Sequence, residues 1–279
     1  MRRLFPVTDQ TTAAGDREWS LDDLADAYAY PERGPAAGGE GDAHGSPGPG
    51  PAEARSAGAG VWLRANMVSS LDGAAQHDGR SQPISSDADM RIFGTLRGLA
   101  DAVVVGAETV RTEGYRPARA RDAFAARRAA AGQGPAPVIA VVSASLNLDF
   151  SLPLFTEPLV PTLLLTGAAA SPERVREAER AGAEVVVAGD GPGVEPARAV
   201  HALAERGLVR LLTEGGPRML GQFAAAGVLD ELCLTVSPTM TVGDAQRIAG
   251  GPLLPDPARF ALDSVLEEAG FLFTRYRRL

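Results

Sequence analysis

Short runs of apolar residues alternate with longer amphipathic stretches along most of the chain. Six of these runs have the length and β-branched content of strands: 61–68, 101–107, 138–143, 162–167, 184–189 and 209–214. Apolar residues at helical spacing follow most of them, over 86–99, 171–181, 195–206 and 217–226. An alternation of strand and helix predicts a mostly parallel sheet that is covered by helices on both faces.

The end of the chain has a different pattern. Residues 230–238, 259–270 and 271–279 are three strand-like runs with little helix between them. Strands that follow one another without a crossover helix pair in antiparallel fashion. We therefore predict an α/β domain with three layers (αβα), in which the central sheet is mixed and mostly parallel and ends in antiparallel C-terminal strands.

The residues before this domain divide into two segments. Residues 1–31 contain one weak amphipathic stretch, SLDDLADAYAYP. Residues 32–60 are mainly Gly, Pro and Ala and contain almost no bulky apolar side chain. Such a segment buries too little surface to offset the entropy lost on ordering. We predict that 32–60 is a disordered, dispensable linker and that 61–279 is the folded domain.

Composition narrows the classes of function. The 279 residues are 45% hydrophobic, enough for one large core. A net charge of −8 argues against nucleic acid as the main partner. No apolar run has the length of a membrane span, and the N-terminal residues lack the apolar core of a signal peptide. The single cysteine, Cys233, excludes an internal disulfide and fits a reducing cytoplasm, where we expect the protein to act.

The motif Glu214-Gly215-Gly216-Pro217 follows the run VRLLT and comes directly before a helix. In α/β sheets, ligands bind beyond the carboxyl ends of strands. Two glycines allow a tight turn and a close approach to the backbone, and proline suits the first position of a helix. The following N–H groups would then face an anion such as a dinucleotide pyrophosphate. The alternative is a plain turn with a solvated glutamate.

A second motif of this kind is GAETVRTEG, residues 106–114. Gly106 again follows an apolar strand, Thr109 can bond a phosphate or ribose, and Glu113 lies one turn later. A capped turn between two elements would explain the same residues. Two turns of this type after separate strands are less often accidental than one.

Other candidates carry weaker signals. His77 lies in a polar, glycine-punctuated loop over 69–86 and is interpreted as a bystander, as are His44 and His201. Cys233 alternates with leucines in a strand and is interpreted as structural. The turn VVVAGDGPGVEP, residues 185–196, lacks the spacing of a dinucleotide-binding fingerprint.

Three motifs together resemble a known family. SLDG, LRGLADAVVVGAETVR and LLTEGGPRMLGQFAAAGVLDELCLTVSP are similar to the pyrimidine reductase of riboflavin biosynthesis. That enzyme is the dihydrofolate-reductase-like C-terminal half of a bifunctional deaminase–reductase. The resemblance covers nearly all of 61–279, and the entry WLRAN looks more like the stand-alone actinobacterial members. A zinc deaminase needs Pro-Cys-x-x-Cys, which a single cysteine cannot supply, so we expect no deaminase half.

The resemblance implies reduction of a ribosylamino-pyrimidine 5′-phosphate by NADPH, with no metal, in a homodimer of the dihydrofolate-reductase fold. By motif position it implies that substrate lies against Ser81, Arg97, Arg116 or Arg119, and Glu214, with Glu214 as the catalytic carboxylate. The implied cofactor-binding residues are Val68, Pro83, Gly106, Thr109, Glu113, Gly215, Gly216, Pro217, Arg218, Met219, Leu220, Gly221 and Gln222.

Three positions depart from the family pattern. Pro83 stands where many relatives have Trp, and Glu113 replaces the common Asp. The run EGYRPAR leaves open whether Arg116 or Arg119 binds the substrate. Two alternatives follow: a reductase of the same fold that acts on dihydrofolate or another pteridine, and a nucleotide-binding protein without turnover.

Overall fold

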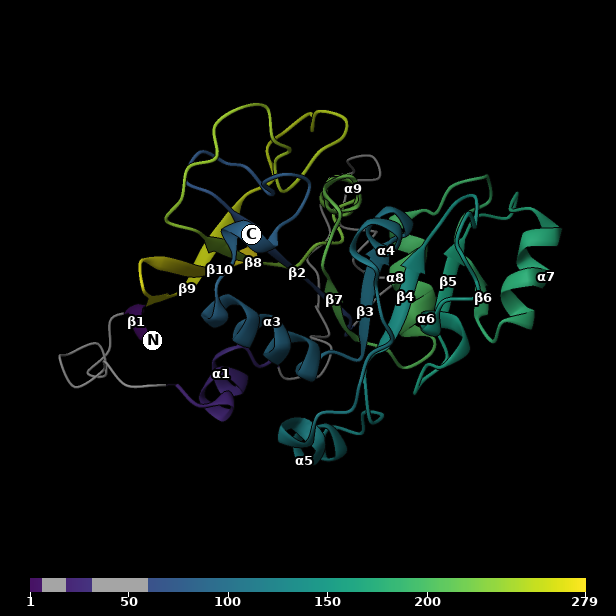
Figure 1. The fold of residues 1–279 in the computed structure, drawn as a ribbon, viewed down its shortest axis with the longest axis horizontal. Helices are drawn as coiled ribbons and strands as arrows, with labels where there is room; N and C mark the ends of the chain where they lie inside the picture. The colour runs from purple at the N-terminus through teal and green to yellow at the C-terminus, as the bar shows by residue number, and fades with distance from the viewer. Residues whose placement is uncertain (7–18, 32–59) are drawn as a thin grey trace, which may run out of the picture.

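The computed structural model describes residues 1–6, 19–31 and 60–279. One ten-stranded sheet runs through the whole molecule, in the order β1-β9-β10-β8-β2-β7-β3-β4-β5-β6 (Figure 1). The strands are β1 (Arg2–Phe5), β2 (Trp62–Ser69), β3 (Ala102–Gly106), β4 (Val138–Val142), β5 (Leu163–Thr166), β6 (Glu184–Val187), β7 (Arg210–Thr213), β8 (Glu231–Val236), β9 (Phe260–Glu268) and β10 (Phe271–Arg278). The predicted linker, 32–60, lies outside the described residues except for Gly60.

The sheet is parallel from β8 through β2, β7, β3, β4 and β5 to β6. From β8 outward, β10, β9 and β1 pair in antiparallel fashion. The prediction of a mostly parallel sheet with antiparallel C-terminal strands is therefore confirmed. Its physical basis is that helices connect the parallel strands, whereas a two-residue turn joins β9 to β10.

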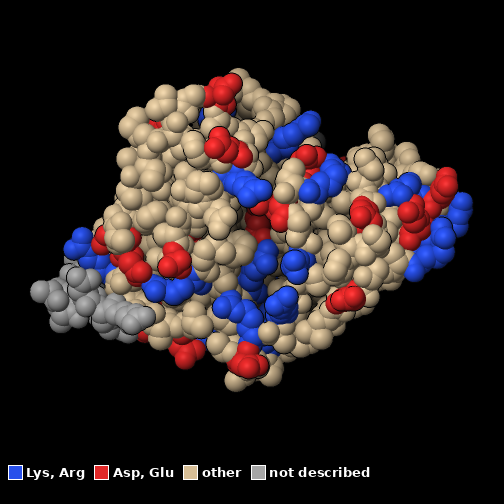
Figure 2. Space-filling view, in the orientation of Figure 1, with Lys and Arg blue, Asp and Glu red and all other residues tan. Residues whose placement is uncertain are grey.

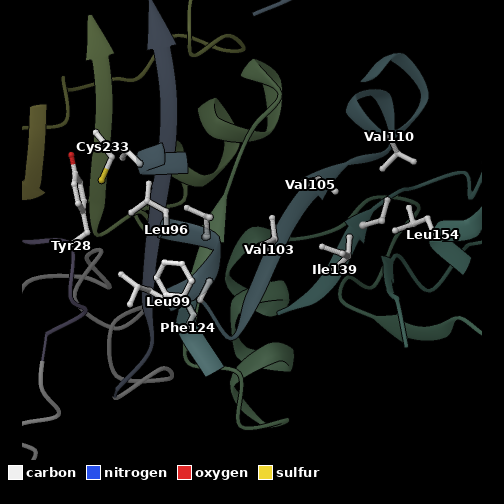
Figure 3. Close-up of a cluster of buried hydrophobic side chains, with 14 of the residues drawn as sticks. Tyr28, Leu96, Leu99, Val103, Val105, Val110, Phe124, Ile139, Leu154 and Cys233 are labelled. Atoms are coloured by element: carbon white, nitrogen blue, oxygen red, sulfur yellow. The ribbon is translucent and has the colours of Figure 1, made fainter. Parts of the chain in front are cut away.

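Helices cover both faces of the sheet, which confirms the three layers. They are α1 (Leu21–Ala27), α3 (Asp87–Leu99), α4 (Ala107–Glu113), α5 (Asp122–Ala130), α6 (Pro153–Thr156), α7 (Pro172–Arg180), α8 (Pro196–Ala204) and α9 (Pro217–Ala225), with a 3-10 turn η3 (Gln82–Ile84). One apolar core lies under α1, α3, α4, α5, α6 and α7; the other lies under α8 and α9. Figure 3 shows part of the first core, in which Leu96, Leu99 and Phe124 lie together.

The described residues of the N-terminal segment form one strand, which the sequence pattern did not indicate, and one helix. Arg2–Phe5 forms the edge strand β1 on β9. The weak amphipathic stretch forms α1, which begins with a capping box between Ser20 and Asp23. Leu24 and Tyr28 are buried in the core, and α1 packs beside α3 (Figure 1). The four predicted helices begin and end within two residues of the expected limits. Two others were not predicted: α6 has only four residues, and α5 contains one large apolar side chain, Phe124.

Within the described ranges, no helix is long and apolar enough to cross a membrane. Cys233 is buried in β8, as the alternating pattern predicts.

Candidate active site

The two glycine turns meet at the carboxyl edge of the sheet. β3 and β7 are neighbours in the sheet, so the turns after them lie side by side. The Gly106 N–H donates to the Gly215 carbonyl oxygen at 3.3 Å. A Cβ on Gly216 would lie 3.5 Å from Thr109 Oγ1, and one on Gly106 would lie 3.9 Å from the Gly216 nitrogen. Residues 110 positions apart in the chain thus form one bare-backbone surface.

Gly216 is the N-cap of α9, and no side chain caps this helix start. Pro217 occupies the first turn as expected, so the first amides of α9 are left for a ligand or for water. Met219 and Leu220 point into the core, so only their backbone could reach a cofactor. Arg218 and Gln222 are exposed.

Gly221 has a different role from the turn glycines. A Cβ at this position would lie 2.0 Å from the Gly250 carbonyl oxygen. The Gly250 N–H donates to the Pro217 carbonyl oxygen at 3.0 Å. Gly221 therefore lets the loop around residue 250 lie directly on α9, and its requirement for glycine is explained by packing.

A compact group of three polar side chains lies next to the turns. Arg97, on α3, binds Glu214 bidentately: Nε to Oε1 and Nη2 to Oε2 are both 2.6 Å. The Tyr115 hydroxyl donates to Glu214 Oε2 and accepts from Arg97 Nη2, each at 2.6 Å. The Arg97 guanidinium also stacks on the Phe93 ring, 4.5 Å from its centroid. Arg97 and Glu214 are 117 positions apart in the chain, and this pairing was not predicted.

The electrostatics fix the protonation of this group. Burial disfavours the charged form of Arg97, but the Glu214 carboxylate outweighs burial and raises the pKa of Arg97. Burial and the Glu214 charge together raise the pKa of Tyr115 well above its usual value. Tyr115 therefore stays protonated and can donate to the carboxylate. A lone tyrosine inside the run EGYRPAR was the only signal for it in the sequence.

Arg97 also lines a pocket of about 480 Å³ together with Arg116 and Arg119. The predicted substrate-binding arginines are thus brought together on one side of α3. Both open candidates, Arg116 and Arg119, line the pocket. Figure 2 shows basic side chains, all of them arginines in a chain without lysine, gathered at the centre of this face.

Four other predicted residues lie on β2, on α4 or at η3. Val68 lies near the carboxyl end of β2, where it pairs with Thr235 of β8. Ser81 and Pro83 are exposed at η3, and within the described parts of the chain neither makes a hydrogen bond to Arg97 or Glu214. Glu113 is exposed at the C-terminal end of α4, at the opposite end of the helix from Gly106.

Asp72 of the SLDG motif joins two loops that follow β2 and β8. Its carboxylate accepts from Ser70 Oγ at 2.5 Å and from the backbone N–H groups of Thr241 and Val242 at 3.2 and 2.7 Å. The hydrogen bond from Ser70, followed by those two amides, lowers the pKa of Asp72 to about 2. Asp72 thus shapes the loops beside the site. His77 is exposed in the same loop.

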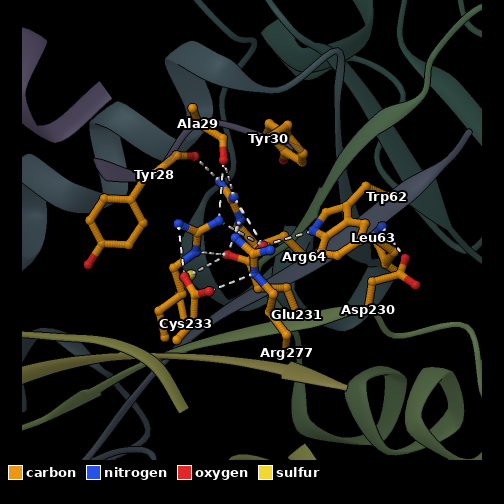
Figure 4. Close-up of polar contacts among 12 residues, drawn as sticks. Tyr28, Ala29, Tyr30, Trp62, Leu63, Arg64, Asp230, Glu231, Cys233 and Arg277 are labelled. Carbon is orange, nitrogen blue, oxygen red and sulfur yellow. Dashed lines mark hydrogen bonds and ion pairs between the residues drawn. The ribbon is translucent and has the colours of Figure 1, made fainter. Parts of the chain in front are cut away.

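The most strongly buried charges belong to another region. Glu231 lies between Arg64 and Arg275, with Oε1 at 2.8 and 2.6 Å from their Nε atoms (Figure 4). The Trp62 indole also donates to Glu231, and the guanidinium of Arg64 donates to the Tyr28 carbonyl. This cluster ties the end of α1 to the sheet and does not reach the glycine turns. Among the residues that the structure describes, no group of His, Cys, Asp or Glu could hold a metal ion.

The glycine-rich turn after β6 is a packing feature and has no predicted phosphate-binding role. A Cβ on Gly189 would lie 2.2 Å from the Gly193 carbonyl oxygen, and one on Gly167 would lie 2.1 Å from that of Gly191. The glycines let two loops cross, and α8 begins only at Pro196.

Comparison with known proteins identifies the family of this chain. The family model of the RibD C-terminal domain matches residues 61–268. Two relatives named 2,5-diamino-6-ribosylamino-4(3H)-pyrimidinone 5′-phosphate reductase are similar to this chain. The protein of Archaeoglobus fulgidus is 29% identical over 68% of this chain and 86% of its own length. The protein of Methanothermobacter thermautotrophicus is 32% identical over 67% of this chain and 82% of its own length.

Solved structures give the same answer. A pyrimidine reductase-like protein of Corynebacterium diphtheriae superposes with a TM-score of 0.69 and 31% identity, over 78% of this chain and 92% of that one. The deaminase/reductase of Thermotoga maritima, at 19% identity over 78% of this chain and 57% of that one, has a TM-score of 0.59 and shares the fold. The resemblance read from the three motifs is confirmed: the chain belongs to the RibD C-terminal domain family, whose named relatives are reductases.

Proposed function

We propose that this protein reduces a ribosylamino-pyrimidine 5′-phosphate to the ribitylamino product in riboflavin biosynthesis, with NADPH as the reductant. The observation that carries the proposal is the juxtaposition of two anion-accepting regions. The bare turns at Gly106 and Gly216 lie on one side of Glu214, and the arginine pocket begins at Arg97 on the other. The relatives aligned over two thirds of the chain are named for reduction of a pyrimidine 5′-phosphate.

The glycine turns fit a dinucleotide. Gly106 and Gly216 leave open the space that two side chains would occupy, and Thr109 Oγ1 faces it. The uncapped start of α9 adds a positive helix end, which favours a pyrophosphate. In this assignment, Gly106, Thr109, Gly216 and the first turn of α9 hold the cofactor. When bound, its nicotinamide supplies the hydride.

The chain's own residues hold and orient the substrate. Two nitrogens of Arg97 are bound by Glu214, which leaves Nη1 as the donor toward the pocket. Glu214 Oε2 accepts two hydrogen bonds and Oε1 accepts one, so one acceptor direction on Oε1 is left for a ring or ribose hydroxyl. Because Tyr115 is held protonated, the group keeps one fixed pattern of donors and acceptors.

The same contacts argue against dihydrofolate. A pterin ring needs a carboxylate that faces its ring nitrogens, and Glu214 instead faces Arg97 and Tyr115. Because Glu214 already accepts hydrogen bonds from Arg97 and Tyr115, the group favours a ligand that binds mainly through arginine. The pocket beyond Arg97 contains further arginines, which suits a phosphate dianion.

The direct test is oxidation of NADPH by the purified protein. We expect turnover with the ribosylamino-pyrimidine 5′-phosphate, weaker turnover with NADH, and none with dihydrofolate. Arg97→Ala should lower kcat/KM for the pyrimidine roughly 10²-fold or more, which corresponds to a loss of several kcal/mol in transition-state binding. The affinity for NADPH should change little. Efficient dihydrofolate reduction without pyrimidine turnover would refute the proposal.

The cellular setting completes the proposal. We place the enzyme in the cytoplasm, where a free, buried Cys233 stays reduced. We also expect a homodimer, as the family resemblance implies. Light scattering at micromolar concentration checks the oligomeric state.

A further inference from the structure

The pocket beside Arg97 is strongly basic. Five arginines line it: Arg97, Arg116, Arg119, Arg121 and Arg128. No aspartate or glutamate is among the lining residues that the structure describes. The whole chain has a net charge of −8, so this local excess of positive charge runs against the composition. A cavity with these walls selects an anion.

Two of the five arginines are already engaged. Glu214 neutralises Arg97. Arg128 is buried and donates to the carbonyl oxygens of Gly98, Ala100 and Gly134 at 3.1, 2.7 and 2.8 Å. Burial lowers the pKa of Arg128, and its contacts hold the end of α3 to α5. Its role is structural.

The other three arginines have no such partners. Arg116, Arg119 and Arg121 are exposed, and within 60–279 none of them makes a hydrogen bond or ion pair with another side chain. By contrast, Arg127, six residues after Arg121 on α5 and outside the pocket, binds Asp26 at 2.8 Å. Among the described residues, the pocket therefore has three positive charges without counter-charges, which is the arrangement that a dianionic phosphate neutralises.

Arg121 differs from Arg116 and Arg119 because its guanidinium packs against the backbone of α3 at Gly94. A Cβ on Gly94 would lie 2.4 Å from Arg121 Nη1, so the guanidinium lies directly on the backbone of α3. The guanidinium also contacts the Phe124 ring, with Cζ 5.2 Å from the ring centroid. The planar group thus rests against both a helix backbone and a ring. Arg116 and Arg119 have no comparable support.

We infer that Arg121, seated on Gly94, binds the 5′-phosphate of the substrate together with Arg116 and Arg119, and that Gly94 is its positioning residue. This inference rests on the proposed function. It separates two tasks: Arg97 and Glu214 hold the part of the substrate next to the cofactor, whereas Arg121 holds the phosphate at the far end. Because the guanidinium is held in place, less side-chain entropy is lost when the phosphate binds.

The test compares two variants with a matched control. Arg121→Ala removes the guanidinium, and Gly94→Ala displaces it while leaving its charge in the chain. Arg127→Ala removes an arginine from the same helix outside the pocket. We expect Arg121→Ala to raise KM for the phosphorylated pyrimidine about 10- to 100-fold, the worth of charge-assisted hydrogen bonds, with kcat nearly unchanged. Gly94→Ala should raise KM in the same direction by less, and Arg127→Ala should not raise it.

Two further measurements separate phosphate binding from a change of pocket shape. KM for the dephosphorylated pyrimidine nucleoside should be the same in wild type and Arg121→Ala. Ribose 5-phosphate should bind the wild-type protein in calorimetry, and Arg121→Ala should weaken that binding by a similar factor.

The outcomes are distinguishable. If the wild type reduces the pyrimidine phosphate and Arg121→Ala has the same KM as Arg127→Ala, the inference is wrong and the proposed function stands. An equal rise in KM for the nucleoside would also overturn the inference. If the wild type reduces no pyrimidine but binds ribose 5-phosphate through Arg121, the phosphate site stands and the proposed function is wrong.

Discussion

Two groups of arginines in this protein have opposite surroundings. Arg64 and Arg275 are buried against Glu231, and backbone carbonyls of α1 and the residues after it accept their remaining N–H groups. Arg116, Arg119 and Arg121 line an open pocket and have no carboxylate partner there.

The difference between these two groups lies in what supplies the counter-charge. In the buried cluster the fold supplies it, so removing a partner should damage stability. In the pocket a ligand must supply it, so removing an arginine should damage binding and leave the fold intact. The Arg97–Glu214 pair lies between these cases, because the pair is formed but one nitrogen of Arg97 still faces the pocket.

The largest expected effect is on stability, from Glu231→Gln. The variant leaves the buried Arg64 without its carboxylate partner and leaves Arg275 with only Asp263, at 3.3 Å, which costs about 3–5 kcal/mol of unfolding free energy. Glu184→Gln is the matched control, because its pair with Arg206 is largely exposed and is worth about 0–1 kcal/mol. Urea denaturation at pH 7 measures both. Equal losses of unfolding free energy in the two variants would mean that the buried ion pairs of Glu231 stabilise the protein no more than an exposed pair does.

The buried cluster also predicts a pH dependence. Burial alone would raise the pKa of Glu231, but Arg64 and Arg275 outweigh it and lower that pKa to about 2, from 4.5. A carboxyl group with a lowered folded-state pKa gives stability that is complete above the unfolded value and is lost as the pH falls. Between pH 5 and pH 2 the wild type should lose about 3 kcal/mol through this group.

Glu231→Gln tests the assignment of that loss. Its unfolding free energy, measured in urea across the same pH range, should fall less steeply than that of the wild type. Parallel curves for the two proteins would show that other carboxylates carry the acid sensitivity.

Two glycines of α3 should respond differently to the same change. A Cβ on Gly98 would lie 2.6 Å from Cγ of the buried Phe124 ring, so Gly98→Ala should cost about 1–3 kcal/mol through overpacking. A Cβ on Gly94 would meet only the guanidinium of the exposed Arg121 side chain, which can shift toward the pocket, and alanine favours a helix by about 0.5–1 kcal/mol over glycine. Gly94→Ala should therefore be as stable as the wild type or more so. Thermal unfolding of both variants decides this, and a large loss in Gly94→Ala would show that Arg121 is structural.

The smallest expected effect on stability comes from Gly216→Val. The backbone at Gly216 has φ −73°, which any residue adopts, and its nearest neighbour is the Thr109 hydroxyl. The fold should therefore survive. A bulky side chain would fill the bare surface, and the affinity for NADPH should fall by at least tenfold, about 1.4 kcal/mol. Gly191→Val in the turn after β6 also has open space and should leave cofactor binding unchanged, so equal NADPH titrations for the two variants would refute a cofactor role for Gly216.

Local pattern was sufficient for much of the fold. The strands from β2 to β10 and the helices α3, α7, α8 and α9 follow from periodicity, because each buries one face of a regular element. β1 was not predicted because its four residues at the sheet edge are too few to show an alternating pattern. α5 was not predicted because Phe124 is its one large buried apolar residue.

The candidate site was predictable in its residue types and less so in its pairings. The sequence indicated Arg97, Glu214 and the glycine turns, but a bond between α3 and the end of β7 depends on how the sheet is assembled. One feature of the sequence indicates the contact of Arg121 with α3. Gly94 and Gly98 lie about one turn apart in a predicted helix, where glycine is unfavourable unless another chain segment packs closely.

The central claim is that two anion sites flank the Arg97–Glu214 pair, one for the cofactor and one for the substrate phosphate. A crystal structure with NADP⁺ and the ribitylamino-pyrimidine 5′-phosphate product tests this directly. The claim predicts the cofactor pyrophosphate at the Gly106 and Gly216 turns and the product phosphate within hydrogen-bond distance of Arg121. A product phosphate bound at the start of α9, or a cofactor bound in the arginine pocket, would contradict it.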